Sequence, residues 1–358
     1  MMYNQTNSST NYSIPCRFDV GSFLRYAGTL VIILGCIGNF LSILVFSRKT
    51  LRSRSCSIYF LALNVSDICV LISYTFESLL FHGYSIQLLS NSFMCKSVIF
   101  LIYASTDISN YLLTLAALDR CILISNSTLR YRFCRKFTAK LMIILVIVIL
   151  GLTNSHFLIG FHVDKEGFCL PTTGNYNYFY VHHYDSYIDI IKTVLIPFTS
   201  IFICNTIIIF KYTRRNILLS IASTKRKSRR RKEKDRQLTW LLLSTSLLFI
   251  MLSSPSEIND FVRTHLSQHF QVKYSCELWA ITIFLILLHQ TNHASHFYVY
   301  TLTGPIFRKE FKKLFCFYQK QTSKKALLNV YSKKKSIEIN SIQNEELADP
   351  NLVVQLEN

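Results

Sequence analysis

Seven long apolar segments limit what this 358-residue chain can fold into. Each has the roughly 20 residues that an α-helix needs to cross about 30 Å of hydrocarbon. Inside lipid the backbone must satisfy its own hydrogen bonds, so we expect helices, whereas a β-barrel would show shorter, alternating strands. The sequence therefore predicts an all-α membrane protein with a seven-transmembrane helix bundle. The segments are residues 27–46, 57–81, 97–118, 141–161, 190–210, 238–258 and 278–302.

The distribution of Lys and Arg predicts the orientation of this bundle in the membrane. Only 16% of the residues are charged, against about 25% in an average soluble domain. The net charge of +19 resembles that of a nucleic-acid-binding protein, but the basic residues lie between the apolar segments. If the N-terminus is outside, 32 of the 39 Lys and Arg lie in the inner segments and six in the outer ones. Inner loops carry such an excess. We therefore expect a multi-pass plasma-membrane protein with no nucleic-acid partner.

The first 26 residues fit an extracellular tail. Three glycosylation sequons begin at Asn4, Asn7 and Asn11 within this polar stretch. The first apolar segment is full length, unlike the short core of a cleavable signal, so we expect the first helix to act as an uncleaved signal-anchor.

The residues after the seventh segment are basic and polar. In 303–319, apolar residues alternate with Lys and Arg, which predicts an amphipathic helix lying in the inner interface. Cys316 near its end is either a palmitoylation site or an ordinary interfacial thiol. Residues 320–358 are expected to form a disordered cytoplasmic tail. The loop 225–236, with nine basic residues in twelve, is expected near anionic lipid headgroups.

Several short motifs occur along the apolar segments. They are Gly38-Asn39, the Leu-x-x-x-Asp from Leu63 to Asp67, Cys95 placed 25 residues before Arg120, Asp119-Arg120-Cys121, Pro197, Pro255 and the stretch from Asn292 to Phe307. In their order and spacing these motifs resemble those of the rhodopsin-like (class A) G-protein-coupled receptors over about 300 residues. The seventh segment is most similar to that of FMRFamide-type and related invertebrate peptide receptors, in which Phe replaces the usual Pro.

The chain also departs from the family pattern. The fourth segment has no Trp, and Ser253 stands where a toggle Trp is usual. Asn205 replaces a Tyr in the fifth segment, and His296-Phe297 replaces Asn-Pro in the seventh. These changes affect the expected activation path more than the fold.

The resemblance implies a disulfide and a switch. Cys95 is expected to pair with Cys169, and Cys16 and Cys276 form a second bridge or remain separate. At the inner end the switch residues are Asp119, Arg120, Asp235 and Tyr300. Arg120 would pair with Asp119 and with Asp235 at the foot of helix six, and release of that foot would admit a heterotrimeric G protein. The loop 225–236 is a second candidate contact for the G protein. Arrestin and receptor kinases are further implied partners.

Asp67 is a carboxylate in the middle of the second segment, where an ionisable residue indicates function. With Ser109 and Asn292 it resembles the family's allosteric sodium site, although His296 replaces an amide of that site. The alternative is a hydrogen-bonded Asp67 that serves helix packing and switching. No other cofactor is expected.

The ligand-binding residues implied by the resemblance are distinctive. Ile102 occupies the position of the amine-binding Asp, and Gln290 that of the retinal-binding Lys, so an amine receptor or an opsin is not expected. Carboxylates recur instead in the outer halves of the helices, and they favour a basic or amidated neuropeptide. Alternatively, Lys192 neutralises Asp189 one turn away. The candidate ligand-binding residues are Glu77, Ile102, Thr106, Asp189, Glu257, Asp260 and Gln290.

Other functional classes explain the sequence less well. A seven-helix transporter or channel would account for intramembrane charges but not for the family motifs at their spacing. An enzyme is not expected, because no nucleophile–base pair or metal motif occurs. We interpret His289, His293 and His296 as polar lining of the bundle.

Overall fold

The computed structural model describes residues 19–125, 127–219 and 226–314. The chain divides into two compact units, Met1–Phe307 and Arg308–Asn358. In the first half of the chain the elements are α1 (Val20–Phe23), η1 (Leu24–Gly28), α2 (Thr29–Phe46), α3 (Lys49–Arg52), α4 (Ser55–Tyr74), η2 (Thr75–Gly83), α5 (Ser92–Ser125), α6 (Ser127–Phe133), α7 (Lys136–Asn154) and α8 (Phe157–Gly160). They are followed by β1 (Phe161–Val163), β2 (Cys169–Pro171), α9 (Asn175–Phe179), η3 (Tyr180–Ile188), η4 (Ile190–Leu195), α10 (Ile196–Leu219), α11 (Arg226–His265), α12 (Gln268–Lys273) and α13 (Ser275–Thr303).

The long helices have the length and composition of membrane spans. Among the described residues, six helical stretches are both long and apolar enough to cross a bilayer, and α13 adds a seventh helix of 29 residues. The six stretches are Val20–Phe46, Ser55–Gly83, Ser92–Ser125, Lys136–Gly160, Asn175–Arg214 and Thr239–His265. The seven-helix bundle predicted from the sequence is confirmed.

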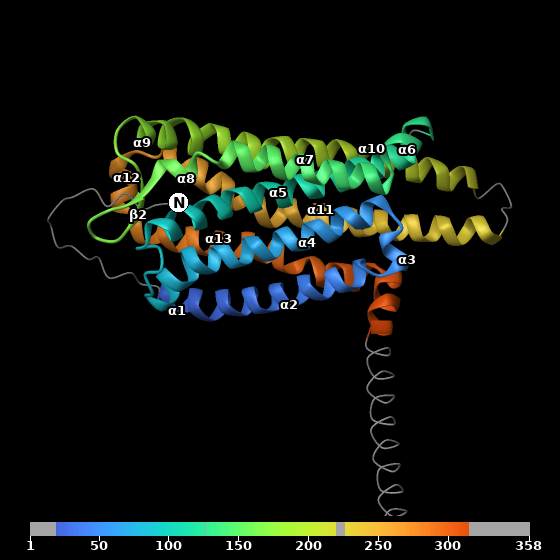
Figure 1. Cartoon of the computed structure of the whole chain (residues 1–358), viewed down its shortest axis with the longest axis horizontal. Helices are drawn as coiled ribbons and strands as arrows, with labels where there is room; N and C mark the ends of the chain where they lie inside the picture. Colours follow the sequence, from blue (N-terminus) through green and yellow to red (C-terminus); the bar gives the residue numbers. More distant parts are fainter. Residues whose placement is uncertain (1–18, 126, 220–225, 315–358) are drawn as a thin grey trace, which may run out of the picture. The chain divides into compact units, whose positions relative to one another are not determined.

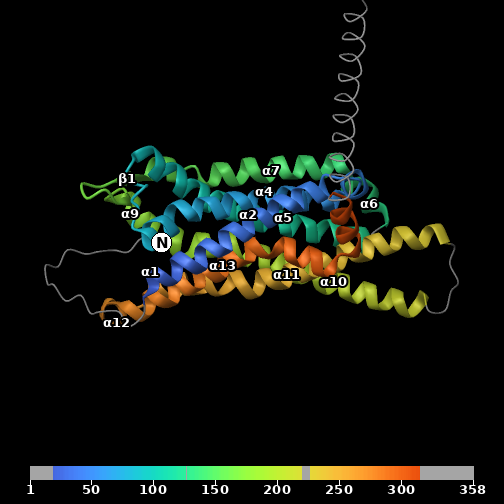
Figure 2. The same ribbon diagram turned by 90° about the horizontal axis from the view of Figure 1, so that it is seen from below.

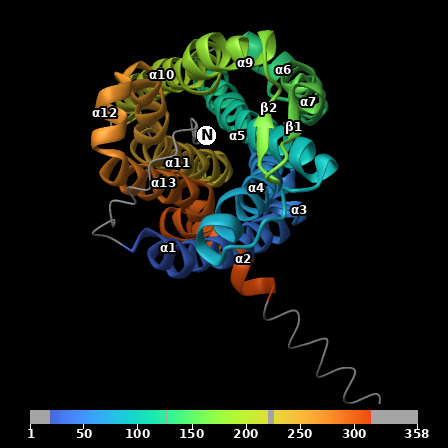
Figure 3. The same ribbon diagram turned by 90° about the vertical axis from the view of Figure 1, so that its left-hand side faces the viewer.

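The long helices run alongside one another (Figures 1 and 2) and form a ring when viewed end-on (Figure 3). Helix α4 packs against α2 and α5, α5 packs against α10, and α13 packs against both α11 and α2. One close approach between helices involves Gly35 of α2. A Cβ atom there would lie 2.6 Å from Cδ1 of Leu71 and 2.7 Å from Cβ of Ala294. Such small residues let helix backbones approach closely inside a membrane.

Polar side chains lie inside this ring, while many large apolar side chains lie outside. Asp67, Asn39 and Asn64 are fully buried, whereas Ile159 is 83% exposed and Leu302 is 77% exposed. Exposed apolar side chains of this size would be unfavourable in water, but the hydrocarbon of a bilayer solvates them well. The burial pattern therefore agrees with the hydropathy.

The helices extend beyond the apolar segments, most of all before the fifth. The apolar segments 141–161 and 190–210 predict a connecting loop over 162–189, but the structure has a short hairpin and then helix from Asn175 onward. In the hairpin, β1 pairs antiparallel with β2, and Val163 lies opposite Cys169. The loop prediction is therefore wrong for 175–189. Hydropathy misses this helix because its Tyr, His and Asn residues are not apolar enough to register.

Within the second unit the structure describes 308–314, which are helical. The Lys313 Nζ atom lies 2.6 Å from Oε1 of Glu310, one turn away. Placement of this helix in the membrane interface stays a prediction, and Cys316 lies outside the described residues.

Candidate functional site

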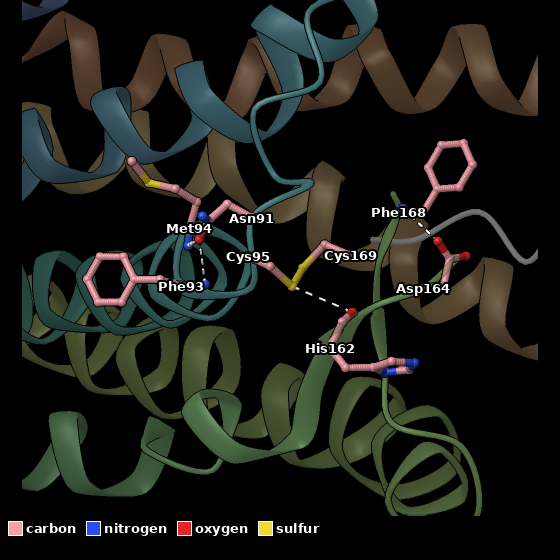
Figure 4. Close-up of a disulfide and its surroundings, with 8 residues drawn as sticks. All are labelled: Asn91, Phe93, Met94, Cys95, His162, Asp164, Phe168 and Cys169. Atoms are coloured by element: carbon pink, nitrogen blue, oxygen red, sulfur yellow. Dashed lines mark hydrogen bonds between the residues drawn. A yellow bond between two sulfur atoms is a disulfide. The ribbon is translucent and has the colours of Figure 1, made fainter. Parts of the chain in front are cut away.

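The two ends of the ring differ, and we name each by a landmark. The disulfide end carries β1, β2, α9 and α12, and the Arg120 end carries α3 and α6 (Figures 1 and 2). The expected disulfide joins Cys95 in the first turn of α5 to Cys169 at the start of β2, with 5.5 Å between their Cα atoms (Figure 4). The bond ties the hairpin to the start of α5.

Local hydrogen bonds fix both partners of this disulfide. The Asn91 side chain caps α5 by accepting from the backbone N–H of Phe93 at 2.8 Å (Figure 4). In the hairpin turn, the Asp164 carboxylate accepts from the backbone N–H of Phe168 at 2.7 Å. These side chains satisfy N–H groups that the helix start and the turn leave unpaired.

Aromatic side chains pack beside the disulfide. The rings of Tyr103 and Phe157 stack with 4.3 Å between centroids, and the hydroxyls of Tyr103 and Tyr180 lie 2.7 Å apart. Ile102, a predicted ligand-binding residue, belongs to the same buried cluster. Among the aromatic residues that follow the hairpin, Tyr180 packs in this cluster, whereas Tyr178 is exposed.

Lys192 organises part of the acidic region. Its Nζ atom lies 2.8 Å from Oδ2 of Asp107, 3.2 Å from Oδ1 of Asp189 and 3.0 Å from Oδ1 of Asn154. Thr193 donates to Asp107 Oδ1 at 2.7 Å. Asp189 is therefore internally paired, which was the alternative that the sequence left open. Asp107 was not predicted from the sequence, although a carboxylate within the apolar segment 97–118 was a usable signal.

The other predicted acids have weaker partners. Glu257 Oε1 lies 3.5 Å from Nδ1 of His289. Glu77 and Asp260 form no hydrogen bond or ion pair within 19–125, 127–219 and 226–314. Glu257 lies close enough to Asp260 and Asp189 for their charges to repel. Arg263 lies close enough to Asp260 to attract it. Among the described residues, Lys192 and Arg263 are therefore set against a larger number of carboxyl groups, which are Glu77, Asp107, Asp189, Glu257 and Asp260.

Two of the predicted polar residues are buried without partners. Gln290 is 3% exposed and Thr106 is 5% exposed. Among the described residues, neither the Gln290 amide atoms nor the Thr106 hydroxyl has a hydrogen-bond partner. Buried polar groups are nearly always hydrogen-bonded, so an exception needs an explanation such as a bound ligand.

Asp67 lies in the middle of the bundle with both carboxylate oxygens occupied. Oδ1 accepts from Ser109 Oγ at 2.6 Å and lies 2.8 Å from Nδ1 of His293, and Oδ2 lies 2.7 Å from Nδ1 of His296. Asn292, the third residue expected to bind sodium, is not among the described hydrogen-bond partners of Asp67. The residues around Asp67 therefore do not fit a sodium ion, because imidazole N–H groups use the oxygens that the ion would need.

The Arg120 end carries the expected ion pair. Asp119 Oδ2 lies 3.8 Å from Nε of Arg120, and both side chains are nearly fully buried. Cys134 donates its thiol to the Asp119 carbonyl oxygen at 3.3 Å. Burial, reinforced by the Asp119 carboxylate, raises the pKa of the Cys134 thiol to about 12. This thiol therefore stays protonated and is a poor nucleophile.

Tyr300 and Asp235 are the other two predicted switch residues. Tyr300 is fully buried, with its ring edge-on to Phe46 at 5.2 Å and to Phe60 at 5.4 Å between centroids. Asp235 lies on α11, but its side chain is outside the described part of the chain.

Several predicted modification sites also fall outside the described residues. They are Asn4, Asn7, Asn11 and Cys16. Cys276, at the start of α13, is disulfide-bonded.

Comparison with known proteins identifies the family. Residues 38–292 match the 7 transmembrane receptor (rhodopsin family) pattern, which covers more than half of the chain. The chain is also 25% identical over 300 residues to galanin receptor 2a of Danio rerio, covering 80% of this chain and 76% of that receptor. The chain therefore belongs to the rhodopsin family of seven-transmembrane receptors, and it functions as a receptor rather than as an enzyme or a transporter.

Proposed function

We propose that this receptor binds an extracellular peptide with a basic group through the carboxylates at the disulfide end, and that it activates a heterotrimeric G protein at the Arg120 end. The proposal places the receptor in the plasma membrane with the disulfide end outside, where the oxidising environment preserves disulfides. Similarity to a galanin receptor supports a peptide ligand. The finer resemblance to FMRFamide-type receptors stays a prediction.

The proposal rests mainly on the excess of acidic over basic side chains near Glu257. Lys192 is shared between Asp107 and Asp189, so one ammonium group faces two carboxylates. Glu257 and Asp260 add further acids whose charges repel those of their neighbours. A guanidinium or ammonium group from a ligand would relieve this repulsion, and a guanidinium can bind a carboxylate through two parallel hydrogen bonds.

The unpartnered polar groups support the same conclusion. A peptide carries backbone and terminal-amide groups that both donate and accept hydrogen bonds. Gln290 and Thr106 have buried groups of matching type without partners in the described part of the chain. A peptide backbone or an amidated C-terminus would satisfy them.

The G-protein half of the proposal rests on the Asp119–Arg120 pair. A buried ion pair at the end of a transmembrane helix is costly unless it is matched, so it indicates function. We propose that the Asp119–Arg120 ion pair breaks when the start of α11 moves outward, and that this movement opens a cavity that binds the G protein. Arrestin and receptor kinases are further proposed partners.

An assay in which charges are removed from the peptide and from the receptor tests the proposed ligand binding. Cells expressing the receptor are screened with amidated peptides that contain Arg, and each active peptide is resynthesised with citrulline, which is neutral and nearly isosteric. We expect citrulline to lower potency by about tenfold or more on the wild-type receptor, because a buried charge contact is lost. The variants Glu257→Gln and Asp260→Asn should lower the potency of the Arg peptide and reduce its advantage over citrulline.

Glu277→Gln is the matched control for this assay, because Glu277 is an exposed acid in the first turn of α13. It should leave both potencies unchanged. Equal potency of the Arg and citrulline peptides on all four receptors would contradict the basic-peptide proposal.

Removal of glycans by an endoglycosidase on intact cells tests the orientation of the receptor in the membrane, since only an external N-terminal tail is accessible to the enzyme.

A further inference from the structure

A series of polar contacts connects the acidic region to the centre of the bundle. It begins at Glu257 on α11, whose Oε1 atom lies 3.5 Å from Nδ1 of His289. The Nε2 atoms of His289 and His293, one turn apart on α13, lie 3.1 Å apart. The Nδ1 atom of His293 then lies 2.8 Å from Oδ1 of Asp67 on α4. Three separate helices are therefore joined through two imidazole rings.

Burial makes each of these contacts consequential. His293 and Asp67 are fully buried, and His289 is 2% exposed. In such an environment a polar group without a hydrogen-bond partner costs far more free energy than it does in water. If one residue of the series loses its partner, the neighbouring residues are therefore favoured to rearrange their own hydrogen bonds. The whole series can in this way pass a rearrangement from one end to the other.

The direction of the hydrogen bonds follows from Asp67. Ser109 and two imidazole Nδ1 atoms converge on its two oxygens, which is an arrangement of donors around an ionised carboxylate. A neutral His293 that donates from Nδ1 must accept at Nε2, so His289 donates from its own Nε2. Nδ1 of His289 faces Oε1 of Glu257 at 3.5 Å, which is the longest contact of the series.

The same geometry explains the poor fit to sodium. The Nδ1 hydrogens of His293 and His296 point at the Asp67 oxygens that a sodium ion would coordinate. A cation at Asp67 would have to displace at least one of these imidazoles and would meet N–H dipoles of the wrong sign. The imidazoles therefore fill both the space and the electrostatic role of the ion.

We infer that His289 and His293 are positioning residues that couple Glu257 to Asp67, and that His293 with His296 replaces the sodium ion of related receptors. A ligand group that binds Glu257 shifts the contact between Glu257 and His289, and the contact between His289 and His293 passes this shift to the hydrogen bond between His293 and Asp67. The inference rests on the proposed function only in assigning Glu257 to the ligand site. Coupling can be carried by a contiguous network of polar side chains, and this series of polar contacts provides one.

The first experiment uses sodium itself as the probe. The full-length receptor is purified in lipid nanodiscs, and its thermal unfolding is followed in NaCl and in choline chloride at equal ionic strength. We expect the same midpoint in both salts for the wild type. A His293→Ser/His296→Asn double variant should gain a sodium-dependent rise, because an ion that binds only the folded state stabilises it. A rise in the wild type that Asp67→Asn abolishes would overturn the inference.

The second experiment measures the coupling by a double-mutant cycle. Glu257→Gln and Asp67→Asn are made singly and together, and basal nucleotide exchange on a purified heterotrimeric G protein is recorded. The two effects should deviate from additivity by about fivefold or more, which is the lower range of allosteric coupling. In a His289→Leu background the deviation should disappear, whereas His289→Gln, which can still donate and accept, should retain part of it. Additive effects with His289 present would overturn the inference.

A His156→Phe background is the control for this cycle. His156 is a partly buried histidine whose Nδ1 bonds the Tyr176 hydroxyl at 2.9 Å, outside the series. It should leave the deviation from additivity unchanged. Neither experiment uses the ligand, and the first uses no G protein. Failure of the inference can therefore be distinguished from failure of the proposed function.

Discussion

Lys192 reaches from η4 to Asp107 on α5, with 2.8 Å between Nζ and Oδ2. The Asp107 side chain is 1% exposed, and the Lys192 side chain is 12% exposed. Asn154 of α7 donates to the same Asp107 oxygen at 2.7 Å, so three helical elements of the ring meet at one carboxylate. This network fixes how α5, α7 and the α10 region pack beside the proposed ligand site.

Removal of the Lys192 charge should therefore destabilise the receptor. Lys192→Met would leave Asp107 buried without its cation, and breaking a buried pair costs about 3–5 kcal/mol. For a chain of this size we expect the thermal midpoint in nanodiscs to fall by roughly 10 °C. The double variant Lys192→Met/Asp107→Asn should recover part of the loss, because the uncompensated charge is gone. An unchanged midpoint for Lys192→Met would refute this account of the network.

The switch pair should restrain basal activity. Asp119→Asn removes the charge that lies 3.8 Å from Arg120. If that pair contributes about 1 kcal/mol to the resting state, basal nucleotide exchange should rise by roughly fivefold. Basal exchange on a G protein, measured at matched receptor amounts, checks this prediction. Exchange at the wild-type level would show that the pair is structural only.

The disulfide should contribute much of the stability of the β1–β2 hairpin. It closes a loop with a sequence separation of 74 residues, for which chain entropy predicts about 4 kcal/mol. Cys95→Ser and Cys169→Ser should each reduce cell-surface expression, as measured by flow cytometry. Cys69→Ser, which changes an exposed free thiol of α4, is the control and should express normally. Normal expression of all three variants would contradict the expected role of the bond.

Two glycines offer a matched test of helix packing. Gly35→Ala would place a methyl group 2.6 Å from Leu71 Cδ1, and such overpacking costs about 1–3 kcal/mol. A methyl group added at Gly151 of α7 would meet no atom within 4 Å, so Gly151→Ala should be neutral or stabilise by about 0.5–1 kcal/mol. Thermal unfolding of both variants checks the prediction. A Gly35→Ala receptor as stable as Gly151→Ala would mean that α2 can shift away from α4 and α13.

The sequence alone determined that the chain forms seven membrane helices. Length and hydropathy suffice for this conclusion, because every span must bury its own backbone hydrogen bonds in lipid. The motifs around Arg120 and the Cys95–Cys169 pairing followed from family resemblance, and the family and the disulfide are confirmed. The helical stretch before η4 was missed because its aromatic and polar residues stabilise a helix by packing against Phe157 and Phe161, which hydropathy does not measure.

Only the tertiary structure decided which charges meet. The sequence predicts a functional Asp67, but it indicates no more than polar lining for the three histidines of α13. Asp67 and His293 are 226 residues apart in sequence, and the packing of α4 against α13 alone brings them to 2.8 Å. Likewise, Lys192 meets Asp107 only because η4 lies beside α5. Hydropathy records whether a residue can enter a membrane, whereas the partner of a buried charge depends on helix rotation and crossing, which are set by the packing of all the helices together.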